Sequence, residues 1–377
     1  MQHFANENAY AHSGENAAMK LATYKDGSRD GQLVVVSRDL SQAHYANGIA
    51  TRLQQVLDDW NFLAPQLEDL FLTLNHGKAR HAFAFEPARC MAPLPRPRAL
   101  LQGNAYAALQ ALIEGQAEAA PGSEPVLLRG PAESLQGPTE PVRLPNEALG
   151  LDFQPGLVAV CADLAQAAPP EGALESVRLL GLSCDWRLQQ LALREREARQ
   201  APHLSQLACS FAPVLVTPDE LGDAWRGGRL KGSLLSLLNG RKFGPVDLGA
   251  EMHFSFGELI AQAVRLKPLR SGVLVASGPL GPARPRQGCA SLAHRRALEA
   301  DDKAGVQTGF MKWGDSLRVD LKGADGQSVF GAIDLDVLNL TDPDPQEAVA
   351  LPVEAAAPDG SADDAQPLMD ADVEAGA

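Results

Sequence analysis

Residues that could do chemistry are scattered along this sequence rather than gathered in a catalytic motif. The 377 residues include eight histidines without metal-ligand spacing, and no H-E-x-x-H pair occurs. The chain also lacks a GxxxxGK[ST] phosphate loop, a G-x-S-x-G nucleophile turn and a glycine-rich dinucleotide loop after a strand. A lone histidine such as His203 or His253 more often makes a structural hydrogen bond than it transfers a proton. Motifs alone therefore assign no reaction.

The cysteines and the start of the chain indicate the compartment. The five cysteines are odd in number, widely spaced and without a C-x-x-C pair, which favours reduced thiols over a disulfide or zinc framework. The first 18 residues hold no Lys or Arg and no apolar stretch, and no apolar run approaches the roughly 18 residues that span a bilayer. We therefore expect a cytoplasmic protein with no signal peptide and no transmembrane helix.

The net charge of −14 is concentrated at the ends of the chain. Residues 341–377 contain ten acidic and no basic residues, and residues 1–18 contain two more acidic ones, so residues 19–340 carry about −2. The segment 341–377 is rich in Ala and Pro and has no aromatic residue, which predicts an acidic disordered tail. Residues 1–18 are expected to form a flexible extension. The acidic balance, and the lack of a basic stripe with aromatic residues, argue against nucleic acid and membrane surfaces as partners.

The periodicity of the ordered part predicts a mixed α/β, β-rich fold. Residues 32–37 (QLVVVS) form a predicted strand after two Asp-Gly turn signals, and residues 46–74 carry the spacing of two helices. Proline-rich residues 92–98 mark the expected boundary between a small N-terminal domain, 19–91, and a larger one, 92–340. Further strands are predicted at 157–161, 214–217, 273–276, 317–321 and 329–333. Capping boxes predict helices that begin after Thr217 and after Ser255.

Several segments along the chain together carry the pattern of a known protein family. The N-terminal segments are KLATYKDGSRDGQLVVVSRDL at 20–40, IATRLQQVLDDWN at 49–61 and APLP at 92–95. The later ones are PNEALGLDF at 145–153, TPDELG at 217–222, FMKWGD at 310–315 and DGQSVFGAID at 325–334. In this order they resemble bacterial proteins of the fumarylacetoacetate hydrolase family, and the resemblance covers about residues 19–335. It implies a small N-terminal module followed by a fumarylacetoacetate hydrolase-like β-sandwich roll, assembled as a dimer.

The resemblance also implies a chemistry, the metal-dependent hydrolysis of a carbon–carbon bond in a β-diketo acid such as an acylpyruvate. That reaction needs Mg²⁺ or Ca²⁺ held by carboxylate oxygens to chelate the keto acid and to stabilise the developing enolate. It also needs a histidine that activates water and a donor, such as lysine, that stabilises the oxyanion.

The residues at the family's functional positions depart from this pattern. The two glutamate ligands of the family correspond to Gln154 and Gly156, and the third ligand, an aspartate, corresponds to Asp185. Leu109 stands in the place of the histidine, and Gln206 in the place of the lysine. Pro279 replaces a threonine in a turn expected to bind substrate. One carboxylate of three remains, so the affinity for Mg²⁺ or Ca²⁺ is expected to fall by orders of magnitude.

The sequence therefore leaves three readings open. The first is a catalytically impaired scaffold or partner, which forms a homodimer or a heterodimer with an intact paralogue. The second is an active hydrolase of acylpyruvate or fumarylacetoacetate-type diketo acids with relocated ligands, for example Asp152, Asp163 and Asp185. The third is a metal-independent protein that binds a small carboxylate in the cavity that corresponds to the family's active site. Near the expected cover of the site, Arg194, Arg196 and Arg199 form either a solvated helix face or a new anion site.

Overall fold

The computed structural model describes residues 18–116, 123–248, 251–286, 288–300 and 302–342. Its internal contacts divide the chain after Leu340, and the fold described below belongs to the unit that ends there. The expected N-terminal extension and acidic tail lie outside the described residues, except for Ala18, Thr341 and Asp342.

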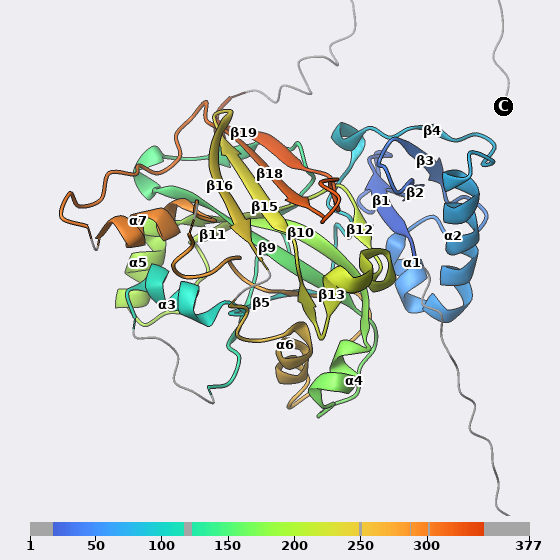
Figure 1. The fold of residues 1–377 in the computed structure, drawn as a ribbon, viewed down its shortest axis with the longest axis horizontal. Helices are drawn as coiled ribbons and strands as arrows, with labels where there is room; N and C mark the ends of the chain where they lie inside the picture. Colours follow the sequence, from blue (N-terminus) through green and yellow to red (C-terminus); the bar gives the residue numbers. More distant parts are fainter. Residues whose placement is uncertain (1–17, 117–122, 249–250, 287, 301, 343–377) are drawn as a thin grey trace, which may run out of the picture. The chain divides into compact units, whose positions relative to one another are not determined.

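The N-terminal part of the unit combines three strands with two helices. Strands β1 (Lys20–Tyr24), β2 (Gln32–Val36) and β3 (Gln42–Tyr45) form an antiparallel meander. Helices α1 (Leu53–Asp58) and α2 (Trp60–Asn75) follow, and α2 lies beside these strands (Figure 1). Val56, Leu67 and Phe71 bury the apolar stripe of the two helices in a core cluster that Leu33 and Val35 share. The predicted strand and the predicted pair of helices are thereby confirmed.

Among the described residues, a large sheet connects this part to the rest of the unit. Its main path has the order β4-β3-β2-β1-β12-β10-β9-β17-β5-β6, with β11 paired to β10 and β7 to β11. The remaining bounds in this sheet are Phe83–Ala84 for β4, Leu215–Val216 for β12, Val177–Leu188 for β10, Leu151–Cys161 for β9, Val273–Ala276 for β17, Ala99–Gly103 for β5, Leu127–Arg129 for β6, Gln206–Phe211 for β11 and Leu135–Gln136 for β7.

A second sheet packs on the first and gives the sandwich its other layer. It has the order β16-β15-β18-β19-β8. Phe153 of β9 and Phe243 of β16 join the layers edge to face, with their ring centres 5.3 Å apart. The bounds are Arg241–Asp247 for β16, Ser233–Leu238 for β15, Ser316–Lys322 for β18, Ile333–Asn339 for β19 and Val142–Leu144 for β8; a separate hairpin pairs β13 (Trp225–Arg226) with β14 (Arg229–Leu230).

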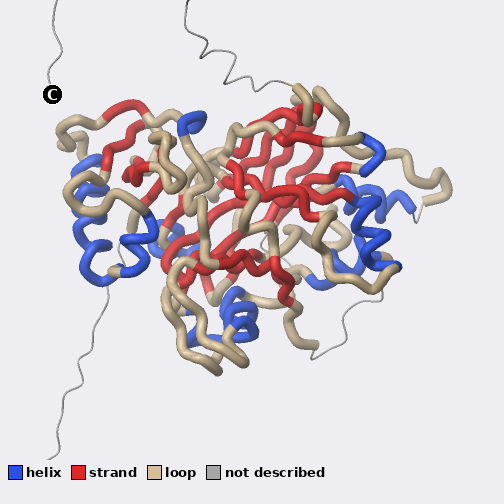
Figure 2. The backbone as a smooth tube through the Cα atoms, turned by 180° about the vertical axis from the view of Figure 1, so that it is seen from behind, coloured by secondary structure: helices blue, strands red, loops and turns tan. Residues whose placement is uncertain are grey.

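Helices lie around the strands rather than between them (Figure 2). Helices α3 (Ala107–Glu114), α5 (Gln189–Glu197) and α7 (Leu292–Ala300) gather near one another in Figure 1, and they are the ones that matter for the site. Helices α4 (Pro170–Leu174) and α6 (Phe256–Ala263) pack against each other elsewhere. Among the described residues there are also three short 3-10 helices, η1 (Pro87–Arg89), η2 (Glu147–Leu149) and η3 (Pro218–Ala224).

Two local predictions differ from the structure. The predicted helix after Thr217 is the 3-10 helix η3, and no side-chain hydrogen bond caps it. The predicted strand at 329–333 is misplaced, because the strand begins at Ile333 and follows the alternating pattern IDLDVLN. Gly331 has a φ of 76°, and a side chain there would overlap Pro213, so the chain turns before the strand starts. The capping box at Ser255 is confirmed, since Ser255 N–H donates to Glu258 Oε2 at 2.8 Å.

Candidate functional site

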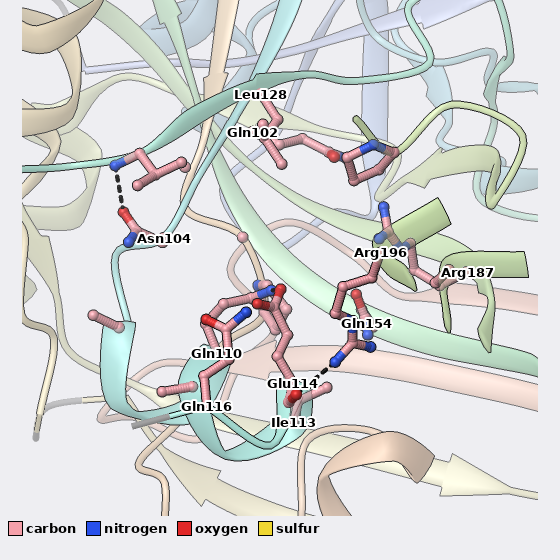
Figure 3. A pocket seen from close by; sticks show the side chains of 18 of the residues that line it. Gln102, Asn104, Gln110, Ile113, Glu114, Gln116, Leu128, Gln154, Arg187 and Arg196 are labelled. Atoms are coloured by element: carbon pink, nitrogen blue, oxygen red, sulfur yellow. Dashed lines mark hydrogen bonds between the residues drawn. The ribbon is translucent and has the colours of Figure 1, made fainter. Parts of the chain in front are cut away.

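A cavity of about 470 Å³ opens between the large sheet and the helices α3 and α5. Strands β9 and β10 supply its floor, and the turn after β17 closes one side. Figure 3 shows side chains from these elements around the space, with Asn104 and Leu128 across from Arg187. The polar residues that line it are Gln102, Asn104, Gln110, Glu114, Gln116, Ser123, Glu124, Gln154, Asp185, Arg187, Gln189, Glu195, Arg196 and Gln200.

The register of β9 and β10 places four polar residues on one face of the sheet. Asp185 lies opposite Gln154, and Arg187 lies opposite Asp152. Residues directly opposite each other in an antiparallel pair have neighbouring side chains on the same face, as have residues two apart on one strand. We call these four residues the β9–β10 cluster. The pairing of β9 with β10 therefore brings together residues that lie about thirty positions apart in the sequence.

Asp185 is a buried carboxylate that lines the cavity and has one oxygen without a hydrogen-bond partner. Its exposed fraction is 6%, and Oδ1 has no hydrogen-bond partner among the described residues. Burial raises the pKa of Asp185 to about 6, although Cys209, Arg187 and Gln102 nearby act in the opposite direction. A buried acceptor without a donor lowers the stability of the fold. A bound molecule that donates a hydrogen bond to Asp185 could remove this cost.

Asp152 is also fully buried, but its oxygens are satisfied. Oδ2 accepts hydrogen bonds from Gln154 Nε2 at 3.1 Å and Gln189 Nε2 at 3.0 Å. Oδ1 accepts from the backbone N–H groups of Leu292 at 2.8 Å and Ala293 at 3.3 Å, at the start of α7. Burial raises the pKa of Asp152 to about 6 against these four hydrogen bonds. Asp152 thus links the floor of the cavity to α7, a role that the sequence did not reveal.

Gly156 sits beneath a turn that fills the space above it. Residues 277–280 are tied to β9 by hydrogen bonds from Ser277 N–H to Leu157 O at 2.8 Å and from Leu280 N–H to Pro155 O at 2.9 Å. A Cβ atom on Gly156 would lie 3.1 Å from the carbonyl oxygen of Gly278. Gly278 itself has a φ of 73°, and a Cβ atom added there would overlap the carbonyl oxygen of Gly103, so the turn has little room to yield.

This packing gives a first prediction. Gly156→Ala should lower the free energy of unfolding by about 1 kcal/mol, because the added methyl group overpacks against backbone that cannot move freely. Urea denaturation followed by circular dichroism measures the change. Gly309→Ala is the matched control, since Gly309 is exposed and has open space around it. Equal stability of the Gly156→Ala variant and the unmodified chain would contradict the tight packing.

The other three positions named in the sequence analysis, Leu109, Gln206 and Pro279, each lie in a different environment. Leu109 is 1% exposed on α3 and belongs to the core, while its neighbour Gln110 lines the cavity. Gln206 lies on β11 and donates from Nε2 to Gln102 Oε1 at 2.8 Å, so its amide nitrogen is engaged. Pro279 lines the cavity at the turn above Gly156. Of the described lining residues, none is a histidine, lysine or cysteine.

The structure does not bring together the alternative ligand set of Asp152, Asp163 and Asp185. Asp152 is near the start of β9, and Asp163 follows the end of that strand. The strand spans about 30 Å from Asp152 to its last residue, Cys161, at roughly 3.3 Å per residue. Asp163 instead accepts from the backbone N–H of Ser271 at 2.7 Å. Across the described ranges, no group of three His, Cys, Asp or Glu residues could hold a metal ion. The relocated site built on these three residues is therefore wrong.

The donor set also does not fit the divalent cation that the family resemblance implies. Mg²⁺ and Ca²⁺ need about six oxygen ligands with carboxylates among them. Asp185 offers one carboxylate, Gly156 offers no side chain, and Gln154 turns its Nε2 toward Asp152. The guanidinium group of Arg187 on the same face carries a positive charge, which would repel a metal cation.

Two further residues in the cavity were missed in the sequence, Arg187 and Glu195. Arg187 is partly buried and forms no hydrogen bond or ion pair with the described residues. Burial lowers the pKa of Arg187, and Asp185 is the strongest of the acidic groups that oppose this shift. Glu195 is 8% exposed, and Oε1 accepts from the backbone of residues 203–205. Burial alone would raise the pKa of Glu195, but these hydrogen bonds hold it below its ordinary value.

The structure also decides whether Arg194 and Arg196 of α5, together with Arg199 after it, form a solvated face or an anion site. Arg194 and Arg199 are exposed, and neither lines the cavity. Arg196 does line it, and its Nη1 donates to the carbonyl oxygen of Glu114 on α3. In Figure 3 this contact appears as a dashed line at the end of α3. The three arginines therefore form no joint anion site.

Comparison with known families identifies the fold. The family model described as "Fumarylacetoacetate (FAA) hydrolase C-terminal" matches residues 100–334, and "Fumarylacetoacetase N-terminal domain 2" matches residues 19–96. The chain belongs to the fumarylacetoacetate hydrolase family. The resemblance recognised in the sequence and the predicted β-rich α/β fold of this family are confirmed.

Solved structures of the fumarylacetoacetate hydrolase family share the fold at low identity. The fumarylacetoacetate hydrolase of Exiguobacterium antarcticum is 19% identical with a TM-score of 0.60, over 85% of this chain and 99% of that one. A probable 2-hydroxyhepta-2,4-diene-1,7-dioate isomerase of Mycobacterium abscessus is 14% identical with a TM-score of 0.59, over 86% and 100%. The maleylpyruvate hydrolase of Sphingobium sp. SYK-6 is 17% identical with a TM-score of 0.56, over 85% and 100%. A search of the curated proteins found no match.

Two observations bear on the environment of the protein. Cys90, Cys161, Cys184, Cys209 and Cys289 are all buried and unpaired. Within the part of the chain that the structure describes, no helix has both the length and the apolar character needed to cross a bilayer.

Proposed function

We propose that the chain is a catalytically impaired member of the fumarylacetoacetate hydrolase family that binds a small molecule in the cavity without a divalent metal. The observation that carries the proposal is the register of β9 and β10. It supplies one cavity-facing carboxylate, Asp185, where chelation of a keto acid needs several. The space above Gly156 is taken by the turn at Gly278.

The family positions for the base and the oxyanion donor also hold unsuitable residues. Water activation needs a base within hydrogen-bond reach of the attacking water, and Leu109 in that sequence position is a core residue. Stabilisation of an oxyanion needs a fixed donor, and the Gln206 amide already donates to Gln102. The cavity nevertheless keeps a volume within the range of ligand sites, about 300–1,000 Å³. A protein that has lost the reaction but still binds a small molecule would have both the unsuitable residues and the retained cavity.

The proposal extends to setting and assembly. We propose a cytoplasmic protein that forms a homodimer or pairs with an intact paralogue, because the five buried thiols suit a reducing compartment. The near-neutral charge of residues 19–340 gives no reason to include nucleic acid among its partners.

A turnover assay tests the proposal. The full chain is incubated with acetylpyruvate and with maleylpyruvate in the presence of Mg²⁺ or Mn²⁺, and the loss of diketo-acid absorbance is followed. The maleylpyruvate hydrolase of Sphingobium sp. SYK-6, assayed with maleylpyruvate, serves as the active control. We expect the rate with this chain to equal the rate with buffer and metal alone. Saturable, metal-dependent cleavage that disappears in Asp185→Ala would support the active-hydrolase reading instead.

A further inference from the structure

The two charged side chains on the cavity side of β10 point to the kind of molecule that the cavity accepts. Asp185 offers an unpartnered oxygen acceptor, and Arg187 offers guanidinium N–H donors that form no hydrogen bond or ion pair with the described residues. Both residues lie on one face of the same strand, two positions apart, so their Cα atoms are separated by about 6.6 Å. A ligand that satisfies both must carry a donor and an acceptor at this spacing.

The charge balance of the cavity disfavours a simple anion. Four acidic groups, Glu114, Glu124, Asp185 and Glu195, line it against two arginines. One of these arginines, Arg196, already donates to the Glu114 carbonyl. A simple cation would in turn leave the partly buried guanidinium of Arg187 unsatisfied, which costs free energy. A zwitterion meets both requirements.

The wall near Asn104 and α3 adds a preference for a carboxamide. Asn104 Oδ1 accepts from the Val126 N–H at 2.9 Å, and Gln110 Nε2 donates to Glu114 Oε1. Asn104 Nδ2 and Gln110 Oε1 make no hydrogen bond with the described residues, so one donor and one acceptor remain on this side of the cavity. Apolar contacts from Ile113 and Leu128 lie beside them.

We propose that the cavity binds a zwitterion of the amino-acid type, with its ammonium group on Asp185, its carboxylate on Arg187 and a polar side chain directed toward Asn104 and Gln110. The inference rests on the proposed metal-independent function, because a divalent cation on Asp185 would occupy the place of the ammonium group. A carboxylate on Arg187 can form two parallel charge-assisted hydrogen bonds.

Calorimetric titration and thermal unfolding in EDTA test the inference with a matched set of probes. The probes are L-glutamine, glutaramate, which lacks the ammonium group, and 4-aminobutanamide, which lacks the carboxylate. L-Glutamine at saturation should raise the melting temperature by about 3 °C or more. Each truncated probe should bind at least about tenfold more weakly, since it leaves one buried charge unpaired.

Variants assign the two contacts. Asp185→Asn should weaken binding of L-glutamine at least about tenfold and leave the affinity for glutaramate unchanged, and Arg187→Gln should weaken L-glutamine but spare 4-aminobutanamide. Arg194→Gln is the control, because Arg194 is exposed and does not line the cavity; its affinity should match the unmodified chain. Thermal unfolding of each variant without ligand verifies that it folds.

The outcomes separate this inference from the proposed function. The inference is overturned if none of the twenty amino acids raises the melting temperature, or if glutaramate binds as tightly as L-glutamine. Metal-dependent cleavage of maleylpyruvate together with L-glutamine binding in EDTA would overturn only the proposed function. An absence of both cleavage and amino-acid binding would overturn only the inference about the ligand.

Discussion

Replacing Asp185 by asparagine is expected to raise the free energy of unfolding by about 2 kcal/mol at pH 7.5. The carboxylate is buried with an unpartnered oxygen, and burial raises its pKa from 3.8 to about 6. A shift of two pKa units corresponds to about 3 kcal/mol between the charged and neutral forms. Asparagine removes the charge and keeps the shape, and part of the gain is lost because its amide is also buried without full hydrogen bonding.

The pH dependence gives this prediction a sign that can be checked. Because the folded-state pKa lies above the unfolded value, the contribution of Asp185 to stability is present below about pH 3.8 and is lost as the pH rises through about 6. The stability difference between variant and unmodified chain should therefore be small at pH 4 and reach its full size above pH 7. Guanidinium denaturation at these pH values measures it, with the exposed Asp223→Asn as control. A destabilised Asp185→Asn at pH 7.5 would contradict the unpaired state of this carboxylate.

Replacing Asp152 by alanine is expected to have the opposite effect and to lower the free energy of unfolding by about 3 kcal/mol. The pKa of this carboxyl is raised by burial to about 6 as well, but it accepts four hydrogen bonds. Alanine would leave the N–H groups of Leu292 and Ala293 and the amides of Gln154 and Gln189 without their acceptor. A hydrogen bond to a charged group contributes about 1.5–3 kcal/mol, and bonds that share one acceptor are not additive.

The loss should be local as well as global. Amide hydrogen exchange is expected to accelerate at the start of α7, where Asp152 holds the first N–H groups, more than in the distant helix α2. Asp223→Ala, in which an exposed side chain is removed, should leave both stability and exchange unchanged. Unaltered exchange at residues 292–295 in Asp152→Ala would show that α7 does not depend on this contact.

The two carboxylates differ because one serves the fold and the other faces the cavity. Their pKa values are shifted in the same direction, yet Asp152 has partners and Asp185 has an oxygen without one. Stability alone would favour a neutral residue at position 185. The retained carboxylate is therefore a feature that binding in the cavity would explain, since functional sites commonly hold groups that reduce stability.

Much of the fold could be predicted from local patterns. The apolar run at 32–36, the helical spacing in 53–75 and the Ser255 capping box are encoded by neighbouring residues, and the structure has each of them. The strand predicted at 329–333 is wrong because Gly331, within this apolar segment, forms a turn and the strand begins only at Ile333. Helix α7 was missed, although Ser291 Oγ accepts from the His294 N–H at 3.1 Å and so caps its start locally. The bond from the Leu292 N–H to Asp152, about 140 residues earlier in the sequence, has no local signal.

The candidate site was predictable only at positions that could be matched one by one to the family pattern. Family order identified Gln154, Gly156 and Asp185, and the strand register makes Gln154 and Asp185 neighbours. The contacts from Gln206 to Gln102 and from Arg196 to Glu114 join segments about 80 to 100 residues apart, so no local pattern reports them. Arg187 could have been found from alternation, because it lies two residues after Asp185 on a strand.

Isothermal titration of the full chain with Mn²⁺ tests the central claim most directly, which is that the cavity no longer holds a divalent metal. With one carboxylate on the floor and the turn at Gly278 above Gly156, we predict no saturable heat below about 1 mM metal. Asp185→Asn should give the same trace as the unmodified chain. Binding of one Mn²⁺ per chain with micromolar affinity, abolished by Asp185→Asn, would contradict the account.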